Sequence, residues 1–241
     1  MISIIIATYN SGRTVGATLE SVLTQSFQDW ECIVVDGASR DNTIDIVKEY
    51  CEKDDRFRYI SERDSGIYDA FNKGWKMSKG EWVHYLGSDD RLTSDGMEKL
   101  VANCEGGDLI VGNTFLEKPW GEITPQEAHG RRGCHQSMIT RKSVVKALGG
   151  FDERYKIVAD ADLNVRLEKA GYRIKNVDCY VSFFSVDGLS QSMKGSWRKT
   201  CELYHVFKRN KSEKYPLWKC SKMFIGNMLV GTYRIIKTRN T

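Results

Sequence analysis

The stretch Glu81–Asp90, EWVHYLGSDD, joins an apolar run to two adjacent carboxylates. The run from Glu81 to Leu86 is typical of a buried β-strand, and Asp89 and Asp90 stand just past its end. In an open α/β sheet, ligands bind in the crevice outside the carboxyl ends of the strands. Hard oxygen ligands at such an end suit Mg²⁺ or Mn²⁺ bridging a diphosphate. Asp is also common in turns, so the pair alone leaves an ordinary turn open.

Strand and helix alternate through the first 90 residues. The run Ile2–Asn10 is almost continuously β-branched and ends in polar residues, which predicts a central strand buried on both faces. Further strands are predicted at residues 31–35, 57–61 and 81–86. Apolar residues at helical spacing predict helices between them, near residues 15–23, 44–51 and 67–77. Asp41 is expected to cap the second helix, and Asp36, Asp64 and Asp89 lie at or just past successive strand ends.

After the paired aspartates the predicted order of elements changes. A helix is expected at Leu92–Cys104 and a strand at Asp108–Asn113. The polar segment Thr114–Thr124 is expected to form a hairpin-like excursion. A short helix is expected to open at Arg141. A strand at residues 179–185 and a helix at residues 196–210 follow.

Composition bounds the class of protein without identifying it. The 241 residues suffice for one large or two small domains, and a hydrophobic fraction of 41% supports a sizeable core. A net charge of +4 is modest and does not indicate nucleic-acid binding. The seven cysteines are odd in number and lack paired spacing, which indicates reduced thiols in a cytoplasmic protein. Met1 leads straight into the first strand, so a secretory signal is not expected.

Four motifs stand in a specific order: Thr8-Tyr9-Asn10, residues 36–43 (DGASRDNT), residues 64–74 (DSGIYDAFNKG) and residues 87–90 (GSDD). In this order they resemble the family-2 glycosyltransferases of GT-A fold, most closely the bacterial branch that builds capsular, exopolysaccharide and O-antigen repeat units. The resemblance covers about Met1 to Ser192. It implies an α/β, Rossmann-like, mostly parallel central sheet flanked by helices. It also implies a GT-A domain over residues 1–210, in which residues 1–90 bind the nucleotide sugar and residues 91–210 form the acceptor half.

The resemblance implies that the donor is a nucleoside-diphosphate sugar. Asp36 would accept an N–H from the nucleobase, while Thr8 to Asn10 would line the base and ribose pocket. A turn-forming Asp36 and ordinary strand-end packing of Thr8 and Tyr9 are the alternatives. The donor-binding residues implied are Thr8, Tyr9, Asn10, Asp36, Asp64, Asn72, Lys73, Asp89, His135 and Gln136. For His135, a hydrogen-bonded structural role is the alternative.

The pair Asp89 and Asp90 matches the family's Asp-x-Asp-type metal motif. The resemblance implies that Asp90 ligates Mn²⁺ or Mg²⁺, with Asp89 as a second ligand or a contact to ribose or sugar. A metal there would neutralise charge as the nucleoside diphosphate departs. Gly87 stands where an extra acid sometimes occurs, which leaves the ligand set open.

The segment Ala159-Asp160-Ala161-Asp162 resembles the family's catalytic-base segment. An inverting transferase needs one carboxylate to take the proton of the attacking hydroxyl, and Asp160 matches that position. Ala159 replaces the usual Glu, which makes Asp162 a rival. Asp162 is expected to cap or brace the first helical turn instead. Both acids could also serve only as N-terminal helix acids, favoured by the helix dipole.

Two C-terminal segments complete the expected architecture. Residues 187–192 resemble the Gly-Gly-x-Ser loop that closes over the diphosphate, with Asp187 in place of the first Gly. Residues 211–241 interleave basic with aromatic and apolar side chains, and their longest uncharged run is too short to span a bilayer. A basic amphipathic helix in the membrane interface is one expectation. A helix packed on the catalytic domain, or on a second subunit of a homodimer, is the other.

The resulting hypothesis is an inverting, metal-dependent glycosyltransferase that uses a nucleoside-diphosphate sugar, with UDP expected. Its acceptor would be a hydroxyl of a polyprenyl-diphosphate-linked oligosaccharide, reached from the cytoplasmic face of the membrane. One alternative is a nucleotidyltransferase, but Ser11-Gly12-Arg13 does not supply the Gly-rich basic loop that it would need. The other is a non-catalytic module that binds nucleotide or carbohydrate.

Overall fold

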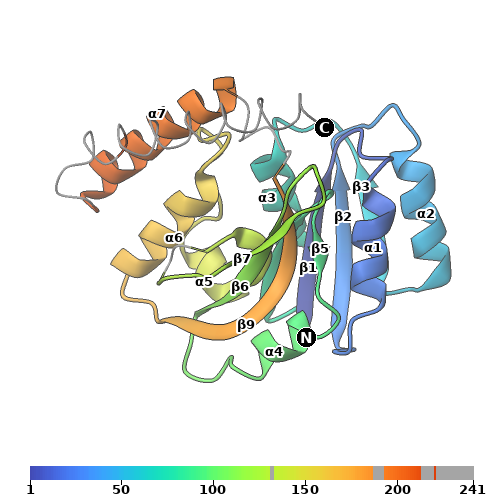
Figure 1. The fold of residues 1–241 in the computed structure, drawn as a ribbon, viewed down its shortest axis with the longest axis horizontal. Helices are drawn as coiled ribbons and strands as arrows, with labels where there is room; N and C mark the ends of the chain where they lie inside the picture. Colours follow the sequence, from blue (N-terminus) through green and yellow to red (C-terminus); the bar gives the residue numbers. More distant parts are fainter. Residues whose placement is uncertain (131–132, 187–192, 213–219, 221–241) are drawn as a thin grey trace.

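The computed structural model describes residues 1–130, 133–186, 193–212 and 220 (Figure 1). Its strands are β1 (Ile2–Thr8), β2 (Trp30–Asp36), β3 (Phe57–Ser61), β4 (Trp82–Gly87), β5 (Arg91–Leu92), β6 (Leu109–Glu117), β7 (Ile123–Gln126), β8 (Met138–Arg141) and β9 (Ile174–Ser185). Its helices are α1 (Val15–Leu23), α2 (Thr43–Lys53), α3 (Ile67–Met77), α4 (Gly96–Val101), α5 (Lys142–Ala147), α6 (Ala159–Lys169) and α7 (Met193–Asn210), with a 3₁₀ turn, η1 (His135–Ser137).

The N-terminal half of the sheet is parallel, in the order β3-β2-β1-β4. Helices α1, α2 and α3 connect successive strands, as expected for a parallel arrangement. The carboxyl ends are in register, because Thr8 pairs with Asp36, Asp36 with Ser61, and Ala7 with Gly87. The polar residues after these strands therefore meet at one edge of the sheet.

The second half of the sheet is mixed. β8 is antiparallel to both β4 and β6, whereas β6 and β9 run parallel. β5 and β7 add antiparallel pairs at β9 and β6. The predicted α/β sheet, mostly parallel and flanked by helices, is confirmed, and its antiparallel pairs are confined to this half.

Two hydrophobic cores cover the two faces of the sheet. One packs α1, α2 and α4 against the even-numbered side chains of β1, such as Ile4 and Ile6. The other packs α3, α5, α6 and α7 against Ile5 and Ala7. Helix α3 packs closely against β1 at Gly74. A Cβ at this position would lie 2.2 Å from Ile5 Cγ2, so the close approach requires glycine.

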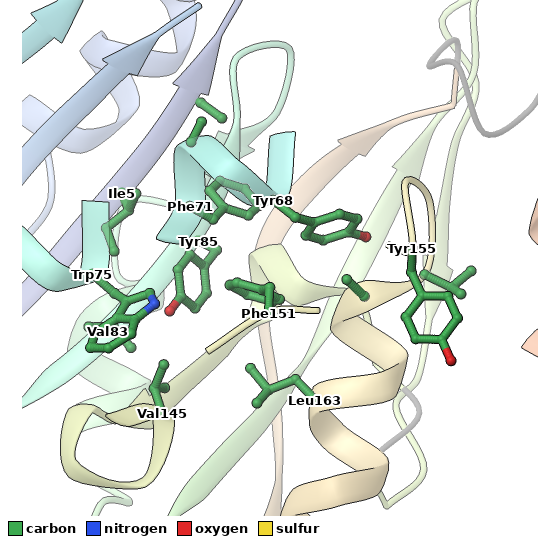
Figure 2. Close-up of a cluster of buried hydrophobic side chains, with 14 of the residues drawn as sticks. Ile5, Tyr68, Phe71, Trp75, Val83, Tyr85, Val145, Phe151, Tyr155 and Leu163 are labelled. Carbon is green, nitrogen blue, oxygen red and sulfur yellow. The ribbon is translucent and has the colours of Figure 1, made fainter. Parts of the chain in front are cut away.

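Aromatic rings fill the core between α3, β4 and the segment before α6 (Figure 2). The ring of Tyr85 lies 4.9 Å from Phe71 and 4.8 Å from Phe151, measured between centroids. Tyr68 lies 5.3 Å from Phe151 in the same way. This cluster ties the α3 motif to the segment that leads into α6.

Some predicted elements differ from the observed ones. The expected helix at residues 92–104 is reduced to α4, because Leu92 belongs to β5 and the Thr93 N–H donates to the carbonyl of Val181 in β9. Asp41 does not occupy the cap position of α2, which is Asn42. Its carboxylate instead accepts the N–H groups of Thr43 and Gly12 and joins two loops.

The expected strand at residues 179–185 extends back to Ile174, and the expected C-terminal helix is α7. The predicted phosphate loop at residues 187–192 and nearly all of the predicted tail at residues 211–241 lie outside the described residues. Within the described residues, no helix has the length and apolar character needed to cross a membrane. The cysteines are free thiols, as expected.

Candidate active site

Asp36 ends β2 with its carboxylate fully buried. Oδ1 accepts hydrogen bonds from the hydroxyls of Thr8 and Ser39, and Oδ2 accepts the Ser39 N–H and the Ser61 hydroxyl. These bonds fix the ends of three adjacent strands and the loop after β2 as one unit. The predicted contact between Asp36 and a nucleobase stays a prediction, because the chain's own donors occupy the carboxylate in this arrangement.

The loop after β1 is tied to the loop after β2. The Asn10 N–H donates to the Ser39 hydroxyl at 2.8 Å, and the Asn10 side-chain oxygen accepts the Arg40 N–H at 2.9 Å. Asn10 has φ +50°, a left-handed conformation that Asn tolerates better than most residues. Tyr9 is 62% exposed, whereas Thr8 is buried beneath it. The predicted contacts of Thr8, Tyr9 and Asn10 with a base and ribose stay predictions.

Asp64 lies against the backbone of Gly37, beside Asp36. A Cβ at Gly37 would meet Asp64 Oδ2 at 2.8 Å, so glycine is needed for this approach. Burial raises the pKa of Asp64; the Gly66 N–H, donating at 2.9 Å, opposes the rise, and the Asp69 carboxylate adds to it. The structure thus brings Asp64 to the strand ends at which the sequence predicted it.

Lys73 reaches from α3 to the loop after β3. Its Nζ lies 2.8 Å from Glu62 Oε1 and 3.8 Å from Asp69 Oδ2, and it donates to the Arg63 carbonyl at 3.0 Å. Burial alone would lower the pKa of Lys73, but the two carboxylates raise it. As folded, the ammonium group stabilises this loop, and its predicted contact with the donor stays a prediction.

Asn72 points into the protein instead of toward the strand ends. Its Nδ2 donates to the Phe151 carbonyl and to Glu153 Oε1, while its Oδ1 accepts from the Phe151 N–H and the Trp75 indole. These bonds use its full donor and acceptor capacity at 5% exposure. Asn72 therefore joins α3 to the segment before α6, and its predicted contact with the donor stays a prediction.

Asp89 and Asp90 follow β4, and Asp90 is 2% exposed. Asp90 Oδ1 accepts the Ser185 N–H at 3.0 Å, and the Asp90 carbonyl accepts the Thr18 hydroxyl at 2.8 Å. Burial raises the pKa of Asp90 to about 7; the Asp89 charge adds to this effect and His135 opposes it. Two adjacent carboxylates, one of them desolvated, favour a cation between them and a ligand.

The donor set at Asp90 fits a bridging cation better than a closed metal site. Among the described residues, no group of three or more His, Cys, Asp and Glu side chains is placed to hold a metal ion. A cation at Asp90 would therefore take further oxygen ligands from a bound molecule. Mg²⁺ and Mn²⁺ accept such mixed sets of carboxylate and phosphate oxygens.

Asp160 stands in the first turn of α6, with its carboxylate held from three sides. Oδ1 accepts the Ala161 N–H at 2.8 Å and lies 3.1 Å from the Tyr68 hydroxyl, while Oδ2 lies 3.4 Å from His135 Nδ1. Burial alone would raise the pKa of Asp160, but His135, Ala161 and Tyr68 together lower it. Burial likewise opposes charge on His135, yet Asp160 raises its pKa. The carboxylate is therefore held ionised beside a histidine that favours its own charged form.

Asp162 faces away from this arrangement. It is fully buried, accepts from Arg166 Nε at 2.7 Å, and accepts from the Asn210 side chain at 3.2 Å. Arg166 also donates to the carbonyls of Leu148 and Gly150. Asp162 therefore braces α6 against its neighbours, as expected for the rival of Asp160.

Several buried polar atoms near η1 have no protein partner within the described chain. They are His135 Nε2 and both amide atoms of Gln136 in η1 and, on the neighbouring strand β4, His84 Nε2 and the Tyr85 hydroxyl. Leaving such an atom unpaired costs about 1–3 kcal/mol, so it calls for an explanation such as a ligand. His135 also links the two halves of the site, because it contacts Asp160 and its charge acts on Asp90.

Sequence reasoning missed the residues that hold the site together. Tyr68 and Ser39 lie within the quoted motifs, and their hydroxyl groups were the available signal. Ser61 ends a predicted strand beside Asp36, which was a weaker signal. Glu202 contacts the backbone before α6 from a helix more than 40 residues away, and no local pattern indicates it.

Comparison with known proteins decides the family. The model of glycosyl transferase family 2 matches residues 3–146. This chain belongs to glycosyl transferase family 2. The glycosyltransferase is 32% identical, over 176 residues, to the PGL/p-HBAD biosynthesis glycosyltransferase of Mycobacterium bovis (strain BCG / Pasteur 1173P2), and the match covers 69% of each chain.

Two solved structures support the GT-A fold of the glycosyltransferase. Mannosyltransferase PcManGT from Pyrobaculum calidifontis, in complex with GDP-Man and Mn²⁺, matches with a TM-score of 0.72 at 15% identity, over 96% of this chain and 71% of that one. S. aureus TarS 1-349 in complex with UDP-GlcNAc matches with a TM-score of 0.64 at 19% identity, over 86% of this chain and 66% of that one. The predicted family and fold are confirmed, and the nucleotidyltransferase alternative is set aside.

Proposed function

We propose that this glycosyltransferase moves a sugar from a nucleoside-diphosphate sugar to an acceptor hydroxyl with inversion at the anomeric carbon. The observation that carries the proposal is the joining of Asp90, His135 and Asp160 in one site. A carboxylate suited to a cation and an ionised carboxylate suited to accept a proton are the two groups that this reaction requires. UDP is the nucleotide we expect.

The donor would bind across the carboxyl ends of β1, β2 and β4. The rigid loops around Asn10 and Ser39 support a base and ribose site, with Tyr9 at its exposed edge. Asp90 would hold Mn²⁺ or Mg²⁺, with Asp89 as a second ligand or a sugar contact. When bound, that cation supplies charge neutralisation for the departing diphosphate.

Asp160 would act as the general base. Its lowered pKa keeps the carboxylate ionised at neutral pH, so it is available to accept the proton of an acceptor hydroxyl. As the hydroxyl oxygen bonds to the anomeric carbon, the bond from that carbon to the diphosphate oxygen breaks, and the proton passes to Asp160. Tyr68 and His135 orient the carboxylate through its two oxygens.

Gln136 and His135 would recognise the donor sugar. Their unpaired amide and imidazole atoms are buried within the same site and can exchange hydrogen bonds with sugar hydroxyls or diphosphate oxygens. Sites built to pair buried polar groups discriminate strongly against ligands that leave them unpaired. We therefore expect strict selection of the donor sugar.

The physiological acceptor belongs to the same proposal. We expect a polyprenyl-diphosphate-linked oligosaccharide, presented at the cytoplasmic face of the membrane during synthesis of a bacterial surface polysaccharide. Residues 211–241 would bind the membrane surface, with packing on this domain or on a second subunit as the alternative. The motif resemblance supports the first expectation, and the basic and apolar residues of that segment support the second.

Incubation of the purified protein with a panel of UDP, GDP and dTDP sugars tests the proposal. We expect one donor to release nucleoside diphosphate in the presence of Mn²⁺, and release to stop when the metal is chelated. A protein that binds a nucleotide but releases no product would instead be the non-catalytic module. Unchanged release in chelator would remove the metal from the proposal.

A further inference from the structure

The backbone just before α6 is held by one buried side chain of α7. Glu202 Oε1 accepts the Lys156 N–H at 3.0 Å, and Oε2 accepts the N–H groups of Ile157 at 2.9 Å and Val158 at 3.3 Å. Glu202 is 8% exposed. One carboxylate thus binds three successive amides, and Asp160 follows two residues later in the chain.

One of these amides belongs to Val158, the cap residue of α6, and the other two belong to the residues just before it. The first N–H groups of an α-helix point out of its N-terminus and need an external acceptor. Val158, the cap residue of α6, makes no side-chain cap hydrogen bond. From another helix, Glu202 accepts the cap amide and the two amides before it, and its negative charge suits the positive end of the α6 dipole.

Other elements hold the same segment from the opposite side. The Tyr68 hydroxyl lies 2.8 Å from the Ile157 carbonyl, while it also lies 3.1 Å from Asp160 Oδ1. Lys156 Nζ donates to the Ser65 carbonyl at 2.9 Å. The segment is therefore held between α7 on one side and the α3 motif on the other, which leaves the start of α6 little freedom.

Glu202 also has a partner within α7. Arg198 Nε donates to Glu202 Oε1 at 2.8 Å, with the guanidinium about half exposed. The carboxylate therefore combines backbone amides and one guanidinium group as hydrogen-bond partners. Among the described residues, none of these hydrogen bonds joins Glu202 or Arg198 to the groups assigned to the donor or the metal.

Resting on the proposed function, we propose that Glu202 is a positioning residue for the catalytic base. It fixes the backbone of residues 156–158 so that the Asp160 carboxylate stands at the angle and distance that proton transfer requires. Placement of a reacting group within about 1 Å can matter roughly 100-fold in rate. Glu202 thus connects α7 to the catalytic centre through the backbone of residues 156–158.

Glu202→Gln is the decisive variant, because it keeps the side chain's length while replacing one acceptor oxygen with a donor. We expect kcat to fall roughly tenfold to 100-fold, while the dissociation constant and KM for the donor stay within about twofold. Hydrogen exchange should rise at the amides of Lys156, Ile157 and Val158, with the thermal midpoint of the protein little changed. A purely structural role would instead lower the midpoint and weaken donor binding together.

Arg198→Gln is the matched control, since it removes the ion pair but leaves the Glu202 carboxylate on the backbone. We expect it to keep nearly full kcat. Glu202→Asp should be impaired like Glu202→Gln, because its shorter side chain withdraws the charge from the amides. Wild-type kcat in Glu202→Gln would overturn the proposal.

Exchange in the wild-type protein tests the same anchor without any variant. The three amides should exchange as slowly as those of α6, and rapid exchange typical of an exposed loop would overturn the proposal even if Glu202→Gln failed to fold. Asp160→Asn separates the two levels of the account. If wild type turns over a donor and Asp160→Asn does not, while Glu202→Gln is fully active, only the positioning role fails. If wild type releases no nucleoside diphosphate from any donor, the proposed function itself fails.

Discussion

Two glutamines, each 1% exposed, lie in different parts of the molecule and differ in their hydrogen bonds. Gln25, after α1, donates to the carbonyls of Ser21 and Thr93 and accepts the Met97 N–H. Gln136, in η1, has no partner for either amide atom within the described residues. The buried amide of Gln25 is paired internally, as the buried carboxylate of Asp36 is. Gln136 instead keeps its amide unpaired where the transferred sugar would lie.

The contrast separates a rigid nucleotide-binding surface, formed by the strand ends around Asp36, from the site of the reaction around Gln136. Internally paired polar groups make the strand ends rigid, which suits a surface that binds the same nucleotide repeatedly. Unpaired groups reduce the stability of the free protein, and they gain hydrogen bonds only when a ligand binds. The comparison therefore predicts that similar substitutions at Gln25 and at Gln136 change the stability of the free protein in opposite directions.

The largest expected effect is that of Asp160→Asn. The amide is nearly isosteric but cannot accept the proton, so transfer should fall about 10²-fold to 10⁴-fold. Donor binding, measured by calorimetry, should be unchanged, because the base contacts the acceptor. Asp162→Asn serves as the comparison, and the assignment is reversed if that variant is inactive while Asp160→Asn transfers sugar.

Asp90→Asn should separate stability from binding. Burial and Asp89 raise the pKa of Asp90 to about 7, compared with about 3.9 in an unfolded chain. The folded protein therefore keeps a proton that the unfolded chain loses, so the stability that this group contributes is present below about pH 4 and lost as pH rises to about 7. With no metal present in either protein, Asp90→Asn should be more stable than wild type at pH 7.5. The free energy of unfolding in urea should be higher by on the order of 2–4 kcal/mol.

The same substitution should abolish the contribution of Mn²⁺ to nucleoside-diphosphate binding. In wild type, that contribution should grow as pH rises through about 7, because the ionised carboxylate binds the cation. Calorimetric titrations at several pH values measure both effects. Equal Mn²⁺-dependent affinity in wild type and Asp90→Asn would contradict the metal assignment.

Asp36→Asn should destabilise the strand ends that the Asp36 carboxylate holds together. The amide nitrogen would face donors that now bind the carboxylate, so the free energy of unfolding should fall by about 2–3 kcal/mol. Asp55→Asn, at an exposed turn residue, is the control and should change stability by less than about 0.5 kcal/mol. An Asp36→Asn protein of wild-type stability that loses nucleotide affinity would instead support direct recognition of the base.

The smallest and sharpest effect concerns the two glutamines. Gln136→Met should stabilise the free protein by about 1 kcal/mol, because it removes unpaired buried polar atoms, while it lowers kcat/KM for the donor. Gln25→Met should destabilise by about 1–3 kcal/mol, because it leaves the Met97 N–H unpaired and removes one hydrogen bond from each of two carbonyls. Thermal unfolding of the two variants side by side decides the point. Destabilisation of both would show that Gln136 is paired in solution.

The parts of the fold that depend on local pattern could be predicted from the sequence. Each of these parts can be recognised within fewer than ten consecutive residues. They are the buried run at β1, the strand-end aspartates and the first turn of α6. Residues 92–104 were expected to form one helix because the pairing of β5 with β9, about 90 residues later, has no local signature. Asn72 belongs to a recognised motif, yet its bonds to Phe151 and Glu153 depend on how α3 packs. The contact between His135 and Asp160 likewise exists only in the folded chain.

A structure of the enzyme with Mn²⁺ and the donor identified from the panel tests the central claim most directly. We predict the nucleotide at the carboxyl ends of β1, β2 and β4, the cation between Asp90 and the diphosphate, and the Gln136 amide hydrogen-bonded to the sugar. The Asp160 carboxylate should face the anomeric carbon from the side opposite the diphosphate. A donor bound elsewhere, or bound here with Gln136 still unpaired and Asp160 turned away from the sugar, would contradict the account.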